Sequence, residues 1–279
     1  MNGNHNKISF AIKNTNWCNL KCAHCSECSG PHVAPNIMPL DKVEQYIGEF
    51  CAMPLPKWEY MVFTGGETMA PYFMKQYEYI PQCLEIAGRA GLAPFIKTNG
   101  VWGTDDALRR RILNDCANAA IKNNTMTSMD VSIDEFHNTV PAVARIIQEI
   151  VSSEHLARCV RVSISGLDTL KSHAQFNYLI AYLKAHNIHV FPSGNTFIAA
   201  RETIGSKILF DFGTPVSQMG RAKQNNIGEV RPDGSSDAVW GNCLQIDNED
   251  VATLNYYYKS PVNGRPVFDV VKELLLKVR

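Results

Sequence analysis

Three cysteines near the N-terminus have the type and spacing needed to hold a metal centre. Cys18, Cys22 and Cys25 form a C-x3-C-x2-C pattern just after an apolar run that is typical of a strand. A short loop of this kind can aim three thiolates at one point. A structural zinc or an ordinary iron–sulfur cluster takes four protein ligands. Three thiolates on a four-iron cluster therefore leave one iron open, where chemistry can take place.

A fourth cysteine keeps a second interpretation open. Cys28 forms a C-x2-C pair with Cys25, and pairs with this spacing are common in zinc sites. Four thiolates from Cys18, Cys22, Cys25 and Cys28 would suit a closed tetrahedral site. The alternatives to an enzyme are thus a zinc-stabilised binding protein and an iron–sulfur electron carrier, and neither of them needs an open iron.

Composition limits the class of protein. The chain has 279 residues, a formal net charge of zero and 45% hydrophobic residues, which is enough for one barrel-sized domain with an extension. Neutral charge argues against nucleic acid as a partner. No apolar run is long enough to cross a bilayer, and the polar N-terminus resembles no signal peptide. An odd total of nine cysteines favours a reducing compartment, so we expect a cytoplasmic protein without a membrane partner.

The elements that must position the cysteines alternate between strand and helix. Apolar runs predict six strands, at Ile8–Ile12, Tyr60–Phe63, Pro94–Lys97, Met129–Ile133, Cys159–Ile164 and Ile188–Phe191. Helices are predicted between them, at Leu40–Cys51, Tyr72–Ala90 with an interruption at Pro81, Asp105–Cys116, Val140–Val151 and Ser172–His186. Regular alternation implies parallel strands with right-handed crossovers.

Polar motifs follow these strands where the working loops of a parallel sheet lie. Gly65-Gly66-Glu67 ends the second strand, Thr98-Asn99-Gly100 the third, and Ser132 and Asp134 lie at the end of the fourth. A curved sheet gathers several strand ends around one centre, so we predict an α/β fold, a partial (β/α)6 TIM-like barrel over residues 1–200. Residues 201–279 are predicted to form a small α+β appendage, with a hairpin at Leu244–Ile246 and Val251–Tyr258 and a helix at Val267–Val278.

These motifs, in this order, resemble the radical S-adenosylmethionine (SAM) enzymes. The resemblance covers the first two-thirds of the chain and rests on the cysteine triplet, on the Gly-Gly-Glu and Thr-Asn-Gly runs, and on Ser132–His137. It implies one site-differentiated 4Fe-4S cluster on Cys18, Cys22 and Cys25, with SAM chelated by the open iron. It also implies that SAM is cleaved reductively and that its 5′-deoxyadenosyl radical abstracts a hydrogen from the substrate. Cys28 is then a non-ligand.

The resemblance also implies a SAM pocket. Gly65, Gly66 and Glu67 would bind the amino group, since glycines let backbone carbonyls approach an ammonium closely. His24 would pack near the adenine, while Thr98, Asn99, Ser132 and Asp134 would approach the ribose and the carboxylate. Arg221 would hold a carboxylate, which is implied only by the resemblance of Met219–Ala222 to a Gly-Arg-Ala run. His137 and Glu135 are expected to be polar groups at the start of a helix.

The C-terminal segment resembles peptide-modifying members of this family. The stretch from Gly241 to Asn255 is similar to the opening of a cysteine-rich SPASM or twitch-like extension, but Cys243 is its only cysteine. A degenerate extension without an auxiliary cluster is therefore expected, and Cys243 is a candidate hydrogen donor. The implied substrate is a ribosomally made peptide, with a small molecule as the enzymatic alternative. An external one-electron reductant such as flavodoxin or ferredoxin is the implied partner.

Overall fold

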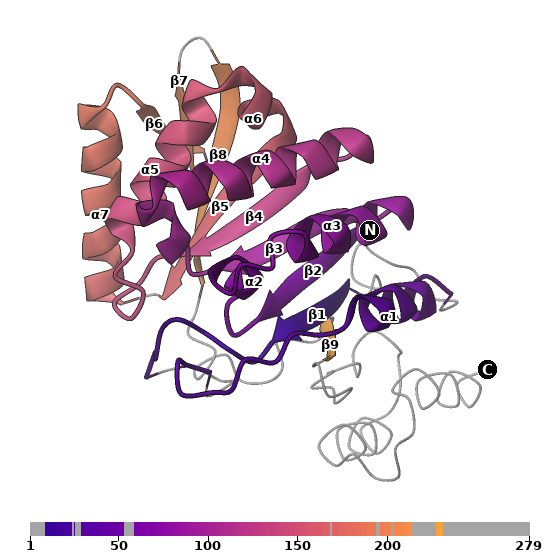
Figure 1. Ribbon diagram of the computed structural model, residues 1–279. Helices are drawn as coiled ribbons and strands as arrows, with labels where there is room; N and C mark the ends of the chain where they lie inside the picture. The colour runs from indigo at the N-terminus through magenta and orange to yellow at the C-terminus, as the bar shows by residue number, and fades with distance from the viewer. Residues whose placement is uncertain are drawn as a thin grey trace, which may run out of the picture.

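The protein is described by a computed structural model that covers residues 9–23, 25, 29–52, 59–167, 169–193, 196–201, 204–213 and 227–230. Within these ranges it has an α/β fold, with helices packed along a nine-stranded sheet in the manner of a partial barrel (Figure 1). None of the helices in this part of the chain has the length and apolar character needed to cross a membrane.

Parallel pairing organises most of the sheet. The first five strands pair in chain order and lie parallel, as the sequence predicted: β1 (Ser9–Thr15), β2 (Tyr60–Gly65), β3 (Ala93–Thr98), β4 (Thr127–Ser132) and β5 (Val160–Leu167). β8 (Ile204–Gly213) continues the parallel set beside β5, and β9 (Ile227–Val230) lies parallel to β1 at the opposite edge. The carboxyl ends of these strands therefore face the same side of the molecule.

Helices connect the parallel strands and form the layer drawn in front of the sheet in Figure 1. They are α1 (Leu40–Ala52), α2 (Ala70–Phe73), α3 (Tyr79–Arg89), α4 (Asp106–Lys122), α5 (Val140–Ser152), α6 (Glu154–Cys159) and α7 (Leu170–Ala185), with a 3-10 turn, η1, at Val101–Thr104. α4 begins where Asp105 accepts a 2.9 Å hydrogen bond from the N–H of Leu108, as a helix cap does. Neighbouring helices pack on one another, which fixes the loops that begin them.

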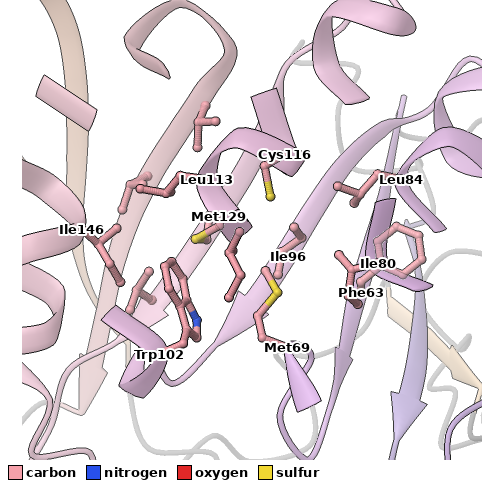
Figure 2. Close-up of a cluster of buried hydrophobic side chains, with 14 of the residues drawn as sticks. Phe63, Met69, Ile80, Leu84, Ile96, Trp102, Leu113, Cys116, Met129 and Ile146 are labelled. Carbon is pink, nitrogen blue, oxygen red and sulfur yellow. The ribbon is translucent and has the colours of Figure 1, made fainter. Parts of the chain in front are cut away.

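The core lies between the helices and the sheet. Alternate strand residues such as Phe63, Ile96 and Met129 are almost fully buried and point toward the helices (Figure 2). Trp102, which is 1% exposed, packs among them from η1, just after the end of β3. Because this large side chain is enclosed, the loop that follows β3 is fixed to the core rather than free at the surface.

One sequence prediction about the bounds of a helix was wrong. The helix expected at Tyr72–Ala90 is two helices, and the break lies between Phe73 and Tyr79 rather than at Pro81. Pro81 lies in the first turn of α3, where a helix needs no backbone donor, so its ring is accommodated there. Lys75, with φ of 61°, turns the chain between the two helices.

The last predicted strand is present but has a different place in the sheet. β6 (His189–Ser193) does not lie beside β5, because it pairs antiparallel with β7 (Thr196–Arg201), which pairs antiparallel with β8. The chain reverses direction between β6 and β7 and again between β7 and β8, and β8 takes the position next to β5. Residues beyond 200 thus contribute β8 and β9 to the main sheet.

Several sequence predictions fall outside the described residues. These are His24, Cys28, Arg221 and Cys243, together with the hairpin at 244–258 and the helix at 267–278. The division into residues 1–200 and 201–279 stays a prediction.

Candidate metal and cofactor site

The cysteine loop begins where β1 ends and lies against the turn that ends β2. The N–H of Gly66 donates to the carbonyl of Thr15 at 2.8 Å, and the N–H of Glu67 donates to the carbonyl of Trp17 at 2.9 Å. These bonds extend the pairing of β1 and β2 past the edge of the sheet. Cys18 is the next residue along, so its position is set by the neighbouring turn.

Two glycines allow this close approach. Gly65 has a φ of 133°, which only glycine adopts without strain, and a Cβ placed there would lie 2.3 Å from the carbonyl oxygen of Thr15. A Cβ on Gly66 would lie 2.1 Å from the carbonyl oxygen of Trp17. The Gly-Gly pair is therefore required for contact between two backbone segments, independently of any ligand.

Cys18 lies in a buried environment rich in N–H groups. Its Sγ accepts hydrogen bonds from the N–H of Leu20 at 3.4 Å and from Asn99 Nδ2 at 3.7 Å. Burial outweighs these donors and raises the pKa of the Cys18 thiol to about 11. A metal that binds here must displace a firmly held proton, and the two N–H groups are placed to stabilise the thiolate that remains.

Asn99 joins the turn after β3 to the cysteine loop. Besides Cys18, its Nδ2 donates to Asn19 Oδ1 at 2.7 Å, while its Oδ1 accepts from the N–H of Val101 at 3.0 Å. Both ends of the amide are thus engaged, which fixes its orientation. The loops after β1 and β3 consequently meet at a single side chain.

Glu67 is turned into the protein and is 1% exposed. Its Oε1 accepts from the N–H of Met69 at 2.9 Å and from Thr98 Oγ1 at 2.5 Å, and its Oε2 accepts from the N–H of Asn99 at 2.8 Å. Burial raises the pKa of this carboxyl against the lowering effect of its hydrogen bonds. The carboxylate therefore connects the turn after β2 to the turn after β3.

Thr98 completes this connection with the core. Its hydroxyl, which donates to Glu67, accepts from Trp102 Nε1 at 3.0 Å and from the N–H of Gly100 at 3.2 Å. Gly100 has a φ of 72°, and a Cβ there would lie 2.5 Å from Val131 on β4. The Thr-Asn-Gly run is thus a tight turn locked between Glu67 and the buried indole.

Cys22 meets a different group of residues, at the end of β4. Its Sγ lies 3.5 Å from His137 Nε2, and His137 Nδ1 lies 2.9 Å from both carboxylate oxygens of Asp134. Burial lowers the pKa of His137, but the hydrogen bonds and charges of Asp134 and Cys22 outweigh it and raise the pKa to about 10. For Asp134, burial acts in the opposite direction and raises the pKa of the carboxyl. Hydrogen bonds from the His137 ring and from two backbone N–H groups outweigh burial, so the pKa of Asp134 is lowered overall.

The described cysteines of the loop are free, and Cys22 and Cys25 are partly exposed. The N–H of Cys25 donates to the carbonyl of Cys22 at 3.1 Å, which closes a turn between them. No three His, Cys, Asp or Glu side chains of the described ranges are gathered tightly enough to hold a metal ion. The donor set itself fits an iron–sulfur cluster, because it offers three thiols on one loop with N–H donors already directed at Cys18.

Ser132 is the last residue of β4 and pairs in register with Ser165 of β5. It is partly exposed, and its carbonyl accepts from Thr139 Oγ1 at 3.2 Å. The structure therefore brings Cys18, Glu67, Thr98 and Asn99 together. It places Cys22 against His137, which Asp134 holds from the other side of the ring. The cofactor roles of these side chains, of Ser132 and of the two glycines stay predictions.

Sequence reasoning missed two residues of this site. Asn19 was overlooked although it lies between two of the cysteines, and His137 was expected to be a polar group at a helix start. The polar run Asp134–His137 after a strand was the only signal for His137. Its contact with Cys22 spans 115 positions, which no local spacing can indicate.

Comparison with known proteins gave matches among solved structures only; no protein-family model and no curated protein matches the chain. A histidine-tagged anSMEcpe with bound AdoMet is 18% identical over 64% of this chain and 49% of its own, with a TM-score of 0.44. The chain thus spans about half the length of that protein.

Two further structures cover more of the chain. Streptococcus suis SuiB bound to S-adenosylmethionine is 12% identical over 93% of this chain and 67% of its own, with a TM-score of 0.43. BtrN in complex with AdoMet and 2-DOIA is 11% identical over 91% of this chain and 87% of its own, with a TM-score of 0.40. Each is a protein to which this chain is similar.

Proposed function

We propose that the chain is a radical SAM enzyme. In this proposal Cys18, Cys22 and Cys25 hold a 4Fe-4S cluster, and SAM binds beside it at the carboxyl ends of the strands. The observation that carries the proposal is the contact of Asn99 with both Cys18 and Asn19, because it places the turn after β3 directly on the cysteine loop. A closed structural zinc site has no need of a second turn built against its ligands.

A cluster with one open iron would chelate SAM and supply the electron that breaks the C5′–S bond, which gives a 5′-deoxyadenosyl radical able to abstract hydrogen from substrate. The chain's own residues orient and enclose the reactants. In this proposal the Gly65-Gly66 turn and Ser132 offer backbone and neutral polar groups to SAM, a cationic nucleoside with hydroxyl groups, and Asn99 holds the cysteine loop beside them. Glu67 fixes the turn after β3, because its carboxylate accepts hydrogen bonds from the Thr98 hydroxyl and from the N–H of Asn99.

Iron analysis and SAM cleavage test this function together. Anaerobic reconstitution should give a brown protein with about four irons per chain, the content of one four-iron cluster. With dithionite it should form 5′-deoxyadenosine from SAM. Alanine at Cys18, Cys22 or Cys25 should abolish both properties, whereas Cys51→Ala, an exposed cysteine at the end of α1, should retain them.

The same measurements decide against the alternatives. Zinc without iron in the purified protein would favour a zinc-stabilised binding protein. A cluster that forms without any cleavage of SAM would favour an iron–sulfur electron carrier.

A ribosomally made peptide is the substrate class we propose. It is supported by the Gly-Arg-Ala run at Met219–Ala222 and by the stretch around Cys243, which are sequence similarities. Incubation with candidate peptides in deuterated buffer, followed by mass spectrometry, would reveal a modified product. Conversion of small molecules alone would favour the alternative substrate class. An unchanged product from Cys243→Ala would exclude this cysteine as the hydrogen donor.

A further inference from the structure

Cys22 contacts a side chain from the segment that follows β4. His137 Nε2 lies 3.5 Å from its Sγ, within the range of a hydrogen bond to sulfur, and the carbonyl of Phe136 lies 3.9 Å from the same atom. The His137 side chain is only 16% exposed and that of Asp134 is 4% exposed. The contact is therefore largely shielded from water, where a hydrogen bond has a stronger electrostatic effect.

Asp134 fixes the imidazole in this position. Both of its oxygens lie 2.9 Å from His137 Nδ1, and Oδ1 also accepts from the backbone N–H groups of Phe136 at 2.8 Å and His137 at 2.9 Å. A carboxylate held by two backbone donors cannot turn away, so Nδ1–H must donate to it. The opposite ring nitrogen, Nε2, then points at Cys22.

The direction of the second hydrogen bond follows from the ligand chemistry. A cysteine sulfur bonded to iron carries no proton, so the hydrogen between the two atoms must be on Nε2. Because Nδ1–H is already given to Asp134, both ring nitrogens then carry hydrogen, and His137 is an imidazolium between two acceptors. Hydrogen bonds to cluster sulfurs are one of the ways in which a protein sets the reduction potential of the iron. Reduction adds negative charge to the cluster, and an N–H group aimed at a sulfur stabilises that charge.

We propose that His137, oriented by Asp134, donates a hydrogen bond to the Cys22 sulfur and thereby makes the bound cluster easier to reduce. His137 is a positioning residue in this role, because it acts through Cys22 and not on SAM. The inference rests on the proposed function, since it requires iron on Cys22. It gives Asp134 and His137 a task at the cluster, whereas the sequence suggested the ribose for Asp134.

The reduction potential tests this inference independently of activity. The reconstituted protein is titrated anaerobically, and the reduced cluster is followed by electron paramagnetic resonance. His137→Phe, which keeps a ring but has no donor, should be about tenfold harder to reduce. For a one-electron couple this is about 60 mV more negative. His155→Phe, at an exposed histidine of α6, should leave the potential unchanged.

Two polar variants keep the test decisive if His137→Phe does not fold. His137→Gln retains an N–H donor long enough to approach the sulfur and should recover part of the lost potential. His137→Asn carries the same amide on a shorter side chain and should behave like His137→Phe. Equal potentials for the wild-type chain, Gln and Asn variants would overturn the inference.

The controls separate this inference from the proposed function. If the wild-type protein assembles four irons and cleaves SAM while all potentials coincide, only the role of His137 fails. If the wild-type protein assembles no four-iron cluster, the proposed function fails and this inference fails with it.

Discussion

At the scale of single residues, Glu67 is the most informative side chain in the site. It was expected to complement a ligand ammonium, and the structure shows both carboxylate oxygens engaged by the chain itself, with three donors from Met69, Thr98 and Asn99. A buried carboxylate with three donors ties two turns together. Its removal would leave those donors without partners, at about 1–3 kcal/mol for each.

The raised pKa of Glu67 predicts a pH dependence of stability. An acid whose pKa is higher in the folded chain than its ordinary 4.5 binds its proton more tightly when folded. The free energy of unfolding should therefore fall as pH rises above that value, until the folded pKa is passed. Glu67→Gln lacks this proton and should lack this part of the slope. Urea unfolding of both proteins from weakly acidic to weakly alkaline pH would measure the difference.

Glu67→Ala separates the charge from the hydrogen bonds. It should lower the free energy of unfolding by about 3 kcal/mol or more at every pH, because three buried donors lose their acceptor. Parallel pH profiles for the wild-type chain and Glu67→Gln would contradict the assignment of a raised pKa to this group.

At the scale of elements, the turn after β2 supports the cysteine loop through backbone contact. Gly66→Ala would place a Cβ 2.1 Å from the carbonyl oxygen of Trp17, so the two segments must separate. We expect a loss of about 3 kcal/mol in the free energy of unfolding, as for an overfilled site. Iron binding after reconstitution should also be lost, because Cys18 follows directly.

Gly48→Ala is the matched control for this substitution. Gly48 lies within α1, and a Cβ there meets nothing within 4 Å. Alanine favours the helix, so the free energy of unfolding should rise by about 1 kcal/mol with iron binding retained. Retained iron in Gly66→Ala would show that the contact with Trp17 does not position the loop.

The elements themselves differ in how well sequence could predict them. β1 to β5 and the helices α1, α4, α5 and α7 were predictable because apolar periodicity is local, and the short helix α6, whose Cys159 was assigned to the next strand, was missed. The break between α2 and α3 was not predictable, since it turns at Lys75 rather than at a glycine. The place of β6 was not predictable either, because it depends on the long-range pairing of β8 with β5, which local periodicity does not encode.

The features of the candidate site also differ in whether sequence could predict them. The three cysteines and the turns that carry Glu67 and Asn99 were predictable as strand-end motifs, since parallel strands bring their carboxyl ends to one side. The inward direction of the Glu67 carboxylate and the contact of His137 with Cys22 depend on tertiary packing. No spacing in the sequence encodes either one.

At the scale of the whole molecule, both flanks of the parallel set are completed by residues beyond 200. β8 borders β5, and β9 borders β1, the strand that leads into the cysteine loop. Phe10 and Ile12 of β1 are fully buried as a result of packing on α1 and its neighbours, with Phe10 stacked on Phe50 at 5.2 Å. The cysteine loop thus projects from a strand that is paired on both sides.

This arrangement predicts that local stability is high in the central sheet and low in the cysteine loop of the iron-free chain. Bound metal should raise it in the loop. Amides of β4, such as that of Met129, lie in the central sheet and should exchange with solvent only through global unfolding. The N–H of Leu20 donates to the Cys18 sulfur at 3.4 Å, a weak acceptor, and should exchange through local opening of the loop in the iron-free chain. Hydrogen exchange read by mass spectrometry resolves both regions.

Iron should protect the loop selectively. Because a cluster binds the folded loop and not the open one, loading should slow exchange around Leu20 by roughly tenfold or more. Exchange in β4 should change far less, and removal of the iron by a chelator should reverse the effect. If loop amides of the iron-free chain exchange as slowly as those of β4, the loop is already rigid. The link between metal binding and loop order would then be wrong.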